Sequence, residues 1–238
     1  MISSNLVADL CFASLFIVLT LVLFQAFIHL QKQCKQPWLN PMLFSILTLI
    51  PILLFFNVTF EQYYQATFPL HKLLEPAVVA LGYPLYQHLK SIKKQWRSIV
   101  LLLFFGALIT IFISFIITMF VINQYDIAVS LSLKSVTTPI GIALTEQLNG
   151  NNSITAFAII LAGLFGALLG PSWLSFINVN SPKAQGLAIG AASHALGTAT
   201  ISKVSYEHAA YSSLALIISA VITAIFSPLI INTLVHFL

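Results

Sequence analysis

The sequence predicts an all-α integral membrane protein with about seven or eight transmembrane segments, two or three of them broken by glycine and proline. Of its 238 residues, 59% are hydrophobic and only 7% are charged, whereas an ordinary soluble domain has about 25% charged residues. The mean hydropathy is +0.98. Apolar runs near the length of about 20 residues that a helix needs to cross a bilayer recur along the whole chain. We therefore expect one transmembrane domain over residues 1–238 and no sizeable soluble domain.

Eight apolar runs account for the expected segments. In order, they span residues 8–30, 41–58, 69–90, 99–122, 127–148, 154–173, 184–204 and 209–237. A segment interrupted by glycine or proline precedes a long clean run twice, at 69–90 and at 184–204. Such pairing is typical of transporters built from structural repeats with broken helices, and it predicts half-repeats of about 1–122 and 126–238. The alternative is that these residues only kink helices that pack together.

Basic residues in the short connectors predict the orientation in the membrane. The connectors 31–39 and 88–97 contain lysine or arginine, whereas those around Glu61 and Asp126 contain neither. Because cytoplasmic loops are enriched in these residues, the two basic connectors are predicted to be cytoplasmic. The N-terminus is then predicted outside. The side of the C-terminus stays open, since it depends on whether 127–148 crosses the membrane or re-enters.

The fifth run contains a lysine deep among apolar residues. Placing Lys134 at mid-membrane costs about 2.5–3.5 kcal/mol, so a compensating structure is expected. Pro139 removes a helical hydrogen bond and disfavours helical geometry at Thr138, and the hydroxyls of Ser135, Thr137 and Thr138 can bind the freed backbone. We expect an unwound turn and then a half-helix N-terminus, which suits a small anion such as a carboxylate. In the alternative, Lys134 snorkels to an interface and the threonines bind only their own backbone.

The seventh run gathers polar residues in the stretch SHALGTATISK. His194 and Thr198 share a helix face, and Gly197 lets the backbone open between them. Histidine titrates near neutral pH and can take up a proton together with an anionic substrate; the alternative is an ordinary hydrogen bond between helices. Glu207 and His208, in the connector that follows, are expected to be solvated. A stripe of small residues for close helix contact is predicted at Gly186, Gly190, Ser193 and Gly197.

The third run, 69–90, is expected to break at Pro76, Gly82 and Pro84. It also contains Glu75, a candidate for proton or ion coupling or a partner for a buried cation. The alternative places Glu75 near the outer surface as a charge at a helix start.

No motif indicates an enzyme. The sequence lacks the GxSxG, HExxH and phosphate-loop patterns, and its six acidic residues are dispersed. Neither a metal nor a cofactor is expected. The basic residues are scattered or sit at the ends of apolar runs, so they indicate topology and not a nucleic-acid surface.

Four strings over about residues 40–235 resemble the LrgB/CidB family of bacterial membrane proteins. They are LLEPAVVALGYPLYQHLK, LKSVTTPIGIA, ITAFAIILAGLFGALLG and GLAIGAASHALGTATISKVSYEHAAYSSLAL. The resemblance implies either of two functions. Members are described as antiholin-like or holin-like regulators of murein hydrolase activity and autolysis, encoded with a small LrgA/CidA-type partner. Related members, including a plastid protein, transport small monocarboxylates such as glycolate, glycerate or pyruvate.

The family motifs carry over onto particular residues of this sequence. They match Lys134, Ser135, Thr137, Thr138, Pro139, His194, Gly197 and Thr198, together with Pro76, Pro84 and Tyr86. The sequence departs from the family pattern at Leu133 (usually proline), Glu75 (usually neutral), Asn149 and Asn151 (part of a Gly-Gly turn) and Thr200 (usually arginine). The absence of that arginine removes a cation that can affect the charge balance with the substrate.

We therefore expect a secondary transporter of small organic anions in the cell inner membrane, with glycolate, glycerate, pyruvate and lactate as candidate substrates. Glu75 and His194 are the candidates for proton coupling, and Lys134 and His194 are expected to face one cavity. The alternative is an antiholin-like regulator of autolysis. Expected partners are membrane lipid, the anion, and either an LrgA/CidA-type protein or further copies of the chain; nucleic acid is not expected.

Overall fold

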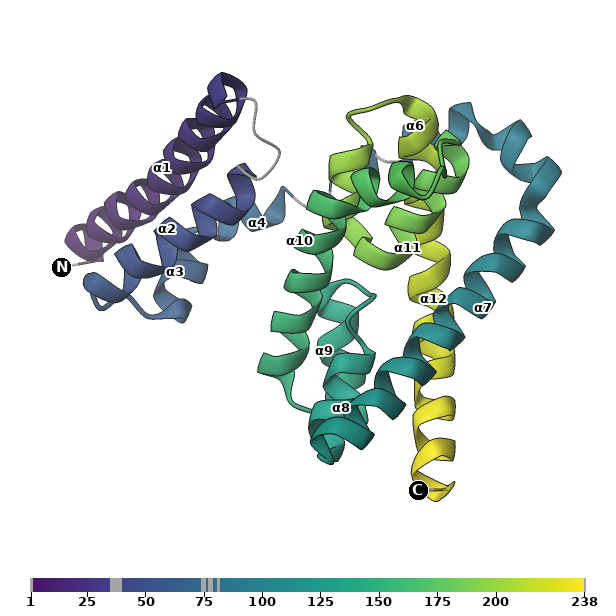
Figure 1. The fold of residues 1–238 in the computed structure, drawn as a ribbon. Helices are drawn as coiled ribbons and strands as arrows, with labels where there is room; N and C mark the ends of the chain where they lie inside the picture. Colours follow the sequence, from purple (N-terminus) through teal and green to yellow (C-terminus); the bar gives the residue numbers. More distant parts are fainter. Residues whose placement is uncertain (1, 35–39, 74–75, 77–78, 81, 238) are drawn as a thin grey trace. The chain divides into compact units, whose positions relative to one another are not determined.

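The computed structural model describes residues 2–34, 40–73, 76, 79–80 and 82–237, and in that part of the chain every regular element is a helix (Figure 1). The chain divides into two compact units, residues 1–80 and 81–238. Among the described residues, four helices are long and apolar enough to cross a membrane, within Phe12–Cys34, Leu89–Ile122, Asn152–Phe176 and Tyr206–His236; one bent helix pair makes a fifth candidate. The all-helical membrane fold is thus confirmed. Several other expected segments are short or broken.

The first unit contains α1 (Ile2–Cys34), α2 (Pro41–Phe55), α3 (Phe60–Ala66) and α4 (Phe68–Lys72). Helices α2 and α3 form the bent pair, with an angle of 116° between them. Tyr63 of α3 holds α1 through a 2.9 Å hydrogen bond with the Thr20 hydroxyl and an edge contact with the Phe16 ring. Most of the other large apolar side chains described in this unit are exposed, as expected for surfaces that face lipid.

The second unit consists of α6 (Gly82–Gln87), α7 (Leu89–Ile122), α8 (Tyr125–Ser132), α9 (Thr138–Gln147), α10 (Asn152–Phe176), α11 (Pro182–Ile201) and α12 (Tyr206–Phe237). Its long helices are α7, α10 and α12. One core cluster joins α7, α8, α9 and α12 around the fully buried Phe115 and Ile231. A second joins α7, α11 and α12 around Tyr211. These clusters hold the short helices between the long ones.

The segment 127–148 forms a re-entrant hairpin. Helices α8 and α9 have 8 and 10 residues, or about 12 and 15 Å at 1.5 Å per residue, too short for either to cross a core of about 30 Å. The Tyr125 hydroxyl donates to the Leu148 carbonyl at 3.1 Å, and the Asn151 N–H donates to Ser130 Oγ at 2.8 Å. The start of α8 therefore lies beside the end of α9. The chain enters and leaves at the same side of the unit.

Helix α11 is also broken and turns back on itself. His194 has φ 39° and ψ −132° inside it. A Cβ on Gly197 would lie 2.7 Å from Ile189 Cγ2, although residues eight apart in a straight helix are separated by about 12 Å. The chain that follows α11 returns to its start as well, since His208 Nε2, in the first turn of α12, lies 3.1 Å from Gln185 Oε1. Segment 184–204, long enough to cross the membrane, forms a second hairpin.

The expectation that His208 is solvated was wrong. Its side chain is 6% exposed, and its other ring nitrogen, Nδ1, lies 2.8 Å from Ser205 Oγ. Because both ring nitrogens have partners, the imidazole is buried at little cost. His208 thereby fastens the first turn of α12 to the first turn of α11.

The two hairpins enter the second unit from opposite ends. The first hairpin follows the end of α7. Helix α10 then runs to the other end of the unit, where the second hairpin starts. The starts of α7 and α12 meet through Ser91 and Tyr211, whose hydroxyls are 2.9 Å apart. The C-terminus lies at the same end of this unit as the connection from α7 to α8 (Figure 1). With connector 88–97 cytoplasmic, the C-terminus is therefore expected outside. The half-repeats 1–122 and 126–238 stay a prediction.

Asparagines end several helices in the left-handed conformation. Asn57, Asn123, Asn149 and Asn178 have φ between 53° and 62°. Asparagine tolerates this region better than most residues other than glycine. Asn149 thus suits a position where a glycine is usual, and Asn151 caps α10 by accepting from the Ser153 and Ile154 N–H groups.

Candidate functional site

A cavity of about 450 Å³ lies between the first hairpin, α7, α11 and α12. Small side chains leave the space open: α11 contributes four alanines and α7 contributes Gly106 and Ala107. The polar part of the wall consists of Ser132, Lys134 and Ser135 from the first hairpin, Thr110 from α7, and Ser219 and Thr223 from α12. The cavity thus combines an apolar wall with one cation and five hydroxyls.

Lys134 lies in the unwound stretch between α8 and α9 and is half-buried. Its Nζ donates hydrogen bonds to Ser114 Oγ on α7 and, at 3.4 Å, to the Leu131 carbonyl. Both acceptors are neutral. The acidic residues whose side chains the structure describes, Glu61, Asp126, Glu146 and Glu207, do not line the cavity. The lysine therefore gives this cavity a positive charge that an anion can neutralise.

The unwound turn and half-helix expected around Pro139 are present. Helix α8 ends at Ser132, α9 begins at Thr138, and Pro139 stands in the first turn of α9. Thr137 occupies the N-cap position with extended backbone, but its side chain makes no capping hydrogen bond. Of the polar residues predicted in this stretch, Lys134 and Ser135 line the cavity, whereas Thr137 and Thr138 do not.

The residues predicted in the second hairpin lie away from this cavity. His194 is 4% exposed, and its Nε2 lies 3.0 Å from the Ile159 carbonyl of α10. Thr198 is buried with no hydrogen-bond partner for its hydroxyl, and Gly197 packs on Ile189. Lys134 and Ser135 instead share the wall with Ala191 and Ala192, which lie three and two residues before His194. The cavity therefore does not unite Lys134 with His194 as expected; substrate binding by His194, Gly197 and Thr198 stays a prediction.

The predicted stripe of small residues is divided among three surfaces. Gly186 and Gly190 contact α12, Ser193 contacts Gly166 of α10, and Gly197 contacts the first half of its own helix. A continuous stripe requires a straight helix, and α11 turns at His194. Close contact is thus correct for all four residues, but they do not form one continuous stripe.

The third run is not broken between Gly82 and Pro84. Both residues lie within the helix α6. A Cβ on Gly82 would meet nothing within 4 Å, so no close contact requires glycine there. Pro76 is helical and exposed. Glu75 lies outside the described residues, so its role in coupling stays a prediction.

Comparison with known proteins decides the family. The sequence model of the LrgB-like family matches residues 20–233. This chain belongs to the LrgB-like family. The holin-like protein CidB of Staphylococcus aureus (strain Mu50) is 34% identical over 223 residues, which cover 92% of this chain and 96% of the relative. YxaC of Bacillus subtilis (strain 168) is 33% identical over 228 residues, covering 93% and 96%. No solved structure matches.

Five hydroxyls near the Lys134 site of this LrgB-like protein were not predicted from the sequence. Ser114 binds the ammonium, and Thr110, Ser132, Ser219 and Thr223 line the cavity. Their signal is a hydroxyl inside a long apolar run, and Ser219 and Thr223 stand four residues apart on one face. That signal is weak, because a serine or threonine in a helix also bonds its own backbone, as Ser219 does with the Ala215 carbonyl.

The backbone of His194 leads to a test of the second hairpin. Glycine adopts its φ of 39° freely, whereas a residue with a Cβ is strained there. We expect His194→Gly to be more stable than His194→Ala by about 1–2 kcal/mol. Both variants lose the hydrogen bond to Ile159. The difference between their free energies of unfolding in detergent therefore reports the backbone strain alone. Equal stability would show that α11 is not broken at this residue.

Proposed function

We propose that this LrgB-like protein is a secondary transporter of small organic anions in the cell inner membrane. Candidate substrates are monocarboxylates such as glycolate, glycerate, pyruvate and lactate. The observation that carries the proposal is Lys134 at the wall of a cavity, with only neutral hydrogen-bond partners among the described residues. A single cation matches a single carboxylate.

The cost of the buried lysine supports this choice. A mid-membrane cation costs about 2.5–3.5 kcal/mol, and a bound carboxylate offsets that cost through charge-assisted hydrogen bonds. Hydroxyls of Ser135, Ser219 and Thr223 line the same space and can serve the second carboxylate oxygen or a substrate hydroxyl. A cavity of about 450 Å³ is roomy for an acid of two or three carbons. A protein with no solute to bind would need none of these features.

The arrangement of the hairpins also supports transport. Two broken segments that enter from opposite sides are typical of transporters in which inverted repeats surround a central site. The count of seven or eight membrane segments then includes the hairpins α8–α9 and α11, which enter without crossing. Within this proposal, Glu75 and His194 remain the candidates for proton coupling.

Uptake into liposomes tests the proposal. Purified protein is expected to carry labelled glycolate, pyruvate or lactate into vesicles faster than empty vesicles take them up, with a further change when a pH gradient is imposed. Uptake of all three equal to that of empty vesicles, with and without the gradient, would rule out transport of these anions.

Filling the cavity without altering its charge tests whether uptake depends on the volume of the cavity. Ala188 lines the cavity and is exposed, so a larger side chain there meets open space and not the packed core. We expect Ala188→Phe to reduce uptake at least tenfold while the melting temperature changes little, because most such positions tolerate substitution within about 0.5 kcal/mol. The control is Val79→Phe, at an exposed position in the first unit, which should leave uptake unchanged.

A second function is favoured by the names of the relatives. CidB is named as holin-like in both Staphylococcus aureus and Staphylococcus epidermidis, each at 34% identity. This supports a regulator of murein hydrolase activity that acts with an LrgA/CidA-type membrane partner or with further copies of this chain. Exposed apolar side chains of α1, such as Leu15, Val18 and Val22, offer a surface for such a partner. The comparisons thus support the regulator more than the transporter, whereas the cavity supports the transporter.

A lysis phenotype distinguishes the two functions. If the protein regulates autolysis through assembly alone, Lys134→Ala should leave both partner co-purification and the autolysis rate unchanged. If the phenotype follows from transport, the same variant should co-purify normally but lose its effect on autolysis. The two results cannot both occur.

A further inference from the structure

The first turns of α7 carry a basic face. Lys90, Lys93, Lys94 and Arg97 follow the spacing i, i+3, i+4, i+7, so they lie on one side of the helix. All four are exposed, and α7 contains no acidic residue to neutralise them. The other side carries Ile92 and Ile99, which are buried in the core cluster around Tyr211. The cations therefore point away from the protein core.

The length of α7 places this basic face at the depth of the lipid headgroups. Its 34 residues span about 51 Å at 1.5 Å per residue, whereas the hydrocarbon core is about 30 Å thick. The apolar part, residues 99–122, is about 36 Å long and fills the core alone. Residues 89–97 therefore extend beyond the hydrocarbon. Exposed Trp96 lies among them, and such aromatic residues mark the interface between core and water.

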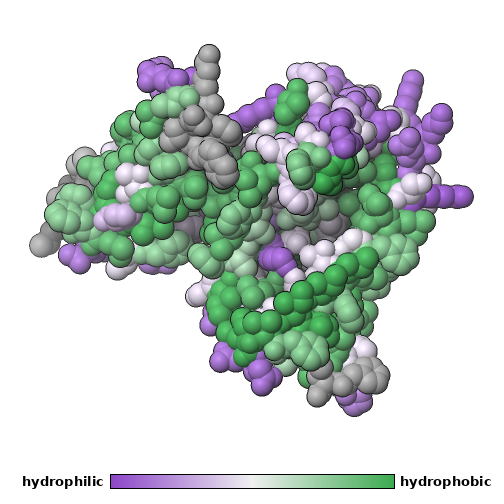
Figure 2. Space-filling view, viewed as in Figure 1, coloured by the Kyte–Doolittle hydropathy of each residue, from purple (hydrophilic) through white to green (hydrophobic). Residues whose placement is uncertain are grey.

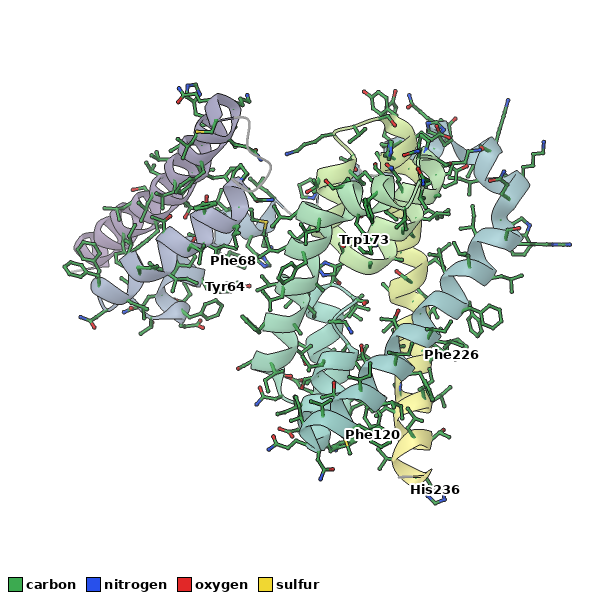
Figure 3. The ribbon with its side chains drawn as sticks, viewed as in Figure 1. Tyr64, Phe68, Phe120, Trp173, Phe226 and His236 are labelled. Carbon is green, nitrogen blue, oxygen red and sulfur yellow. The ribbon has the colours of Figure 1, made fainter. Side chains whose placement is uncertain are left out.

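Other basic residues gather at the same end of the second unit. Lys183 Nζ lies 5.8 Å from the ring centre of Tyr211, whose hydroxyl contacts Ser91 of α7. Lys203 is exposed just before α12, where Glu207 is the single acidic residue in the first turn. Figure 2 shows hydrophilic surface around the start of α7, and Figure 3 shows side chains that extend from it with nitrogen at their tips. The opposite end carries Asp126 and Glu146 in α8 and α9, which contain no lysine or arginine.

We propose that the basic face of α7, formed by Lys90, Lys93, Lys94 and Arg97, binds the headgroups of anionic phospholipids in the cytoplasmic leaflet. Charge complementarity carries the choice: several cations at headgroup depth match a surface of lipid phosphates. Helix α7 also supplies Leu102, Gly106 and Thr110 to the Lys134 cavity. Headgroup binding does not depend on which solute, if any, the cavity takes.

Native mass spectrometry of the delipidated protein in detergent tests this binding. The full-length protein is titrated with phosphatidylglycerol and, separately, with phosphatidylcholine of the same acyl chains. We expect tighter binding of phosphatidylglycerol, weakened about fivefold for each charge removed in Lys94→Gln and in the double variant Lys93→Gln/Lys94→Gln. The charge-retaining variant Lys93→Arg/Lys94→Arg should bind like the unaltered protein. Lys72→Gln, which removes an exposed cation from α4, is the matched control and should also bind normally.

Three results would overturn the proposal. The first is equal affinity for the two lipids, and the second is unchanged phosphatidylglycerol binding in the double glutamine variant. The third is displacement of the lipid by inorganic phosphate, which would indicate a site for small anions and not a lipid surface. Each variant's melting temperature is recorded, and binding is compared at temperatures where all variants are folded. None of these results bears on transport through the cavity, so failure here leaves the proposed function in place.

Discussion

Replacing Lys134 with methionine is expected to remove anion uptake without destabilising the protein. Methionine is unbranched and apolar, so it occupies the space of the lysine chain without its charge. Losing one partner of a desolvated charge pair costs at least about 2 kcal/mol of binding, a fall in anion affinity of about 30-fold or more. Removing the cation also saves about 2.5–3.5 kcal/mol of membrane insertion cost, against the loss of charge-assisted bonds to Ser114 and Leu131. The free energy of unfolding should therefore stay unchanged or rise by about 1 kcal/mol.

Loss of uptake without loss of stability would distinguish a binding role of Lys134 from a structural one. If Lys134 only tied the first hairpin to α7, Lys134→Met would lower the melting temperature and affect uptake only as far as the protein unfolds. Lys72→Met removes an exposed charge from α4, far from Lys134 in the sequence. It should change neither uptake nor the melting temperature. Uptake by Lys134→Met at the normal rate and affinity would contradict the role given to the lysine.

The substitution Gly190→Ala is expected to produce the largest loss of stability. A Cβ at this position would lie 2.7 Å from Ser212 Cα and 2.8 Å from its carbonyl carbon. Because these are backbone atoms of α12, no side-chain rotation relieves the clash, and α11 and α12 must separate. Overpacking of this kind costs about 1–3 kcal/mol or more. A fall in melting temperature during detergent unfolding measures it.

Gly106→Ala is the matched control, since Gly106 also lies inside a helix but its Cβ would meet nothing within 4 Å. Alanine is favoured over glycine in a helix by about 1 kcal/mol, so this variant should be as stable as the unaltered protein or more stable. A Gly190→Ala variant as stable as Gly106→Ala would show that α11 and α12 do not pack as closely as described.

The sequence led to Lys134 because its depth in an apolar run and the nearby Pro139 are both visible in the chain. Its partner Ser114 is twenty residues earlier in a run that reads as one clean helix, so only the packing of α7 on α8 reveals the contact. The four alanines of α11 that line the cavity carry no chemical signal in the sequence. Their importance is the space that they leave.

The second hairpin shows where local signals mislead. Gly197 was expected to open the helix, yet the left-handed residue is His194, three positions earlier. A positive φ is uncommon for any residue other than glycine, and contacts with Ile159 and Gly163 of α10 hold His194 there. Segment 184–204 was also long enough to cross the membrane. The hydrogen bond between His208 and Gln185, which are 23 residues apart, marks it as a hairpin.

Solid-state NMR can test most directly whether the Lys134 cavity holds a carboxylate. Protein with ¹⁵N at the lysine Nζ positions is reconstituted with lactate labelled with ¹³C at its carboxyl carbon, and the dipolar coupling between the two nuclei is measured. We predict a coupling that corresponds to about 3–4 Å, as charge-assisted hydrogen bonds of 2.7–2.9 Å require, and its loss in Lys134→Met. A lactate uptake rate above that of empty vesicles, with no coupling to lysine or with the same coupling in Lys134→Met, would contradict this account of the site.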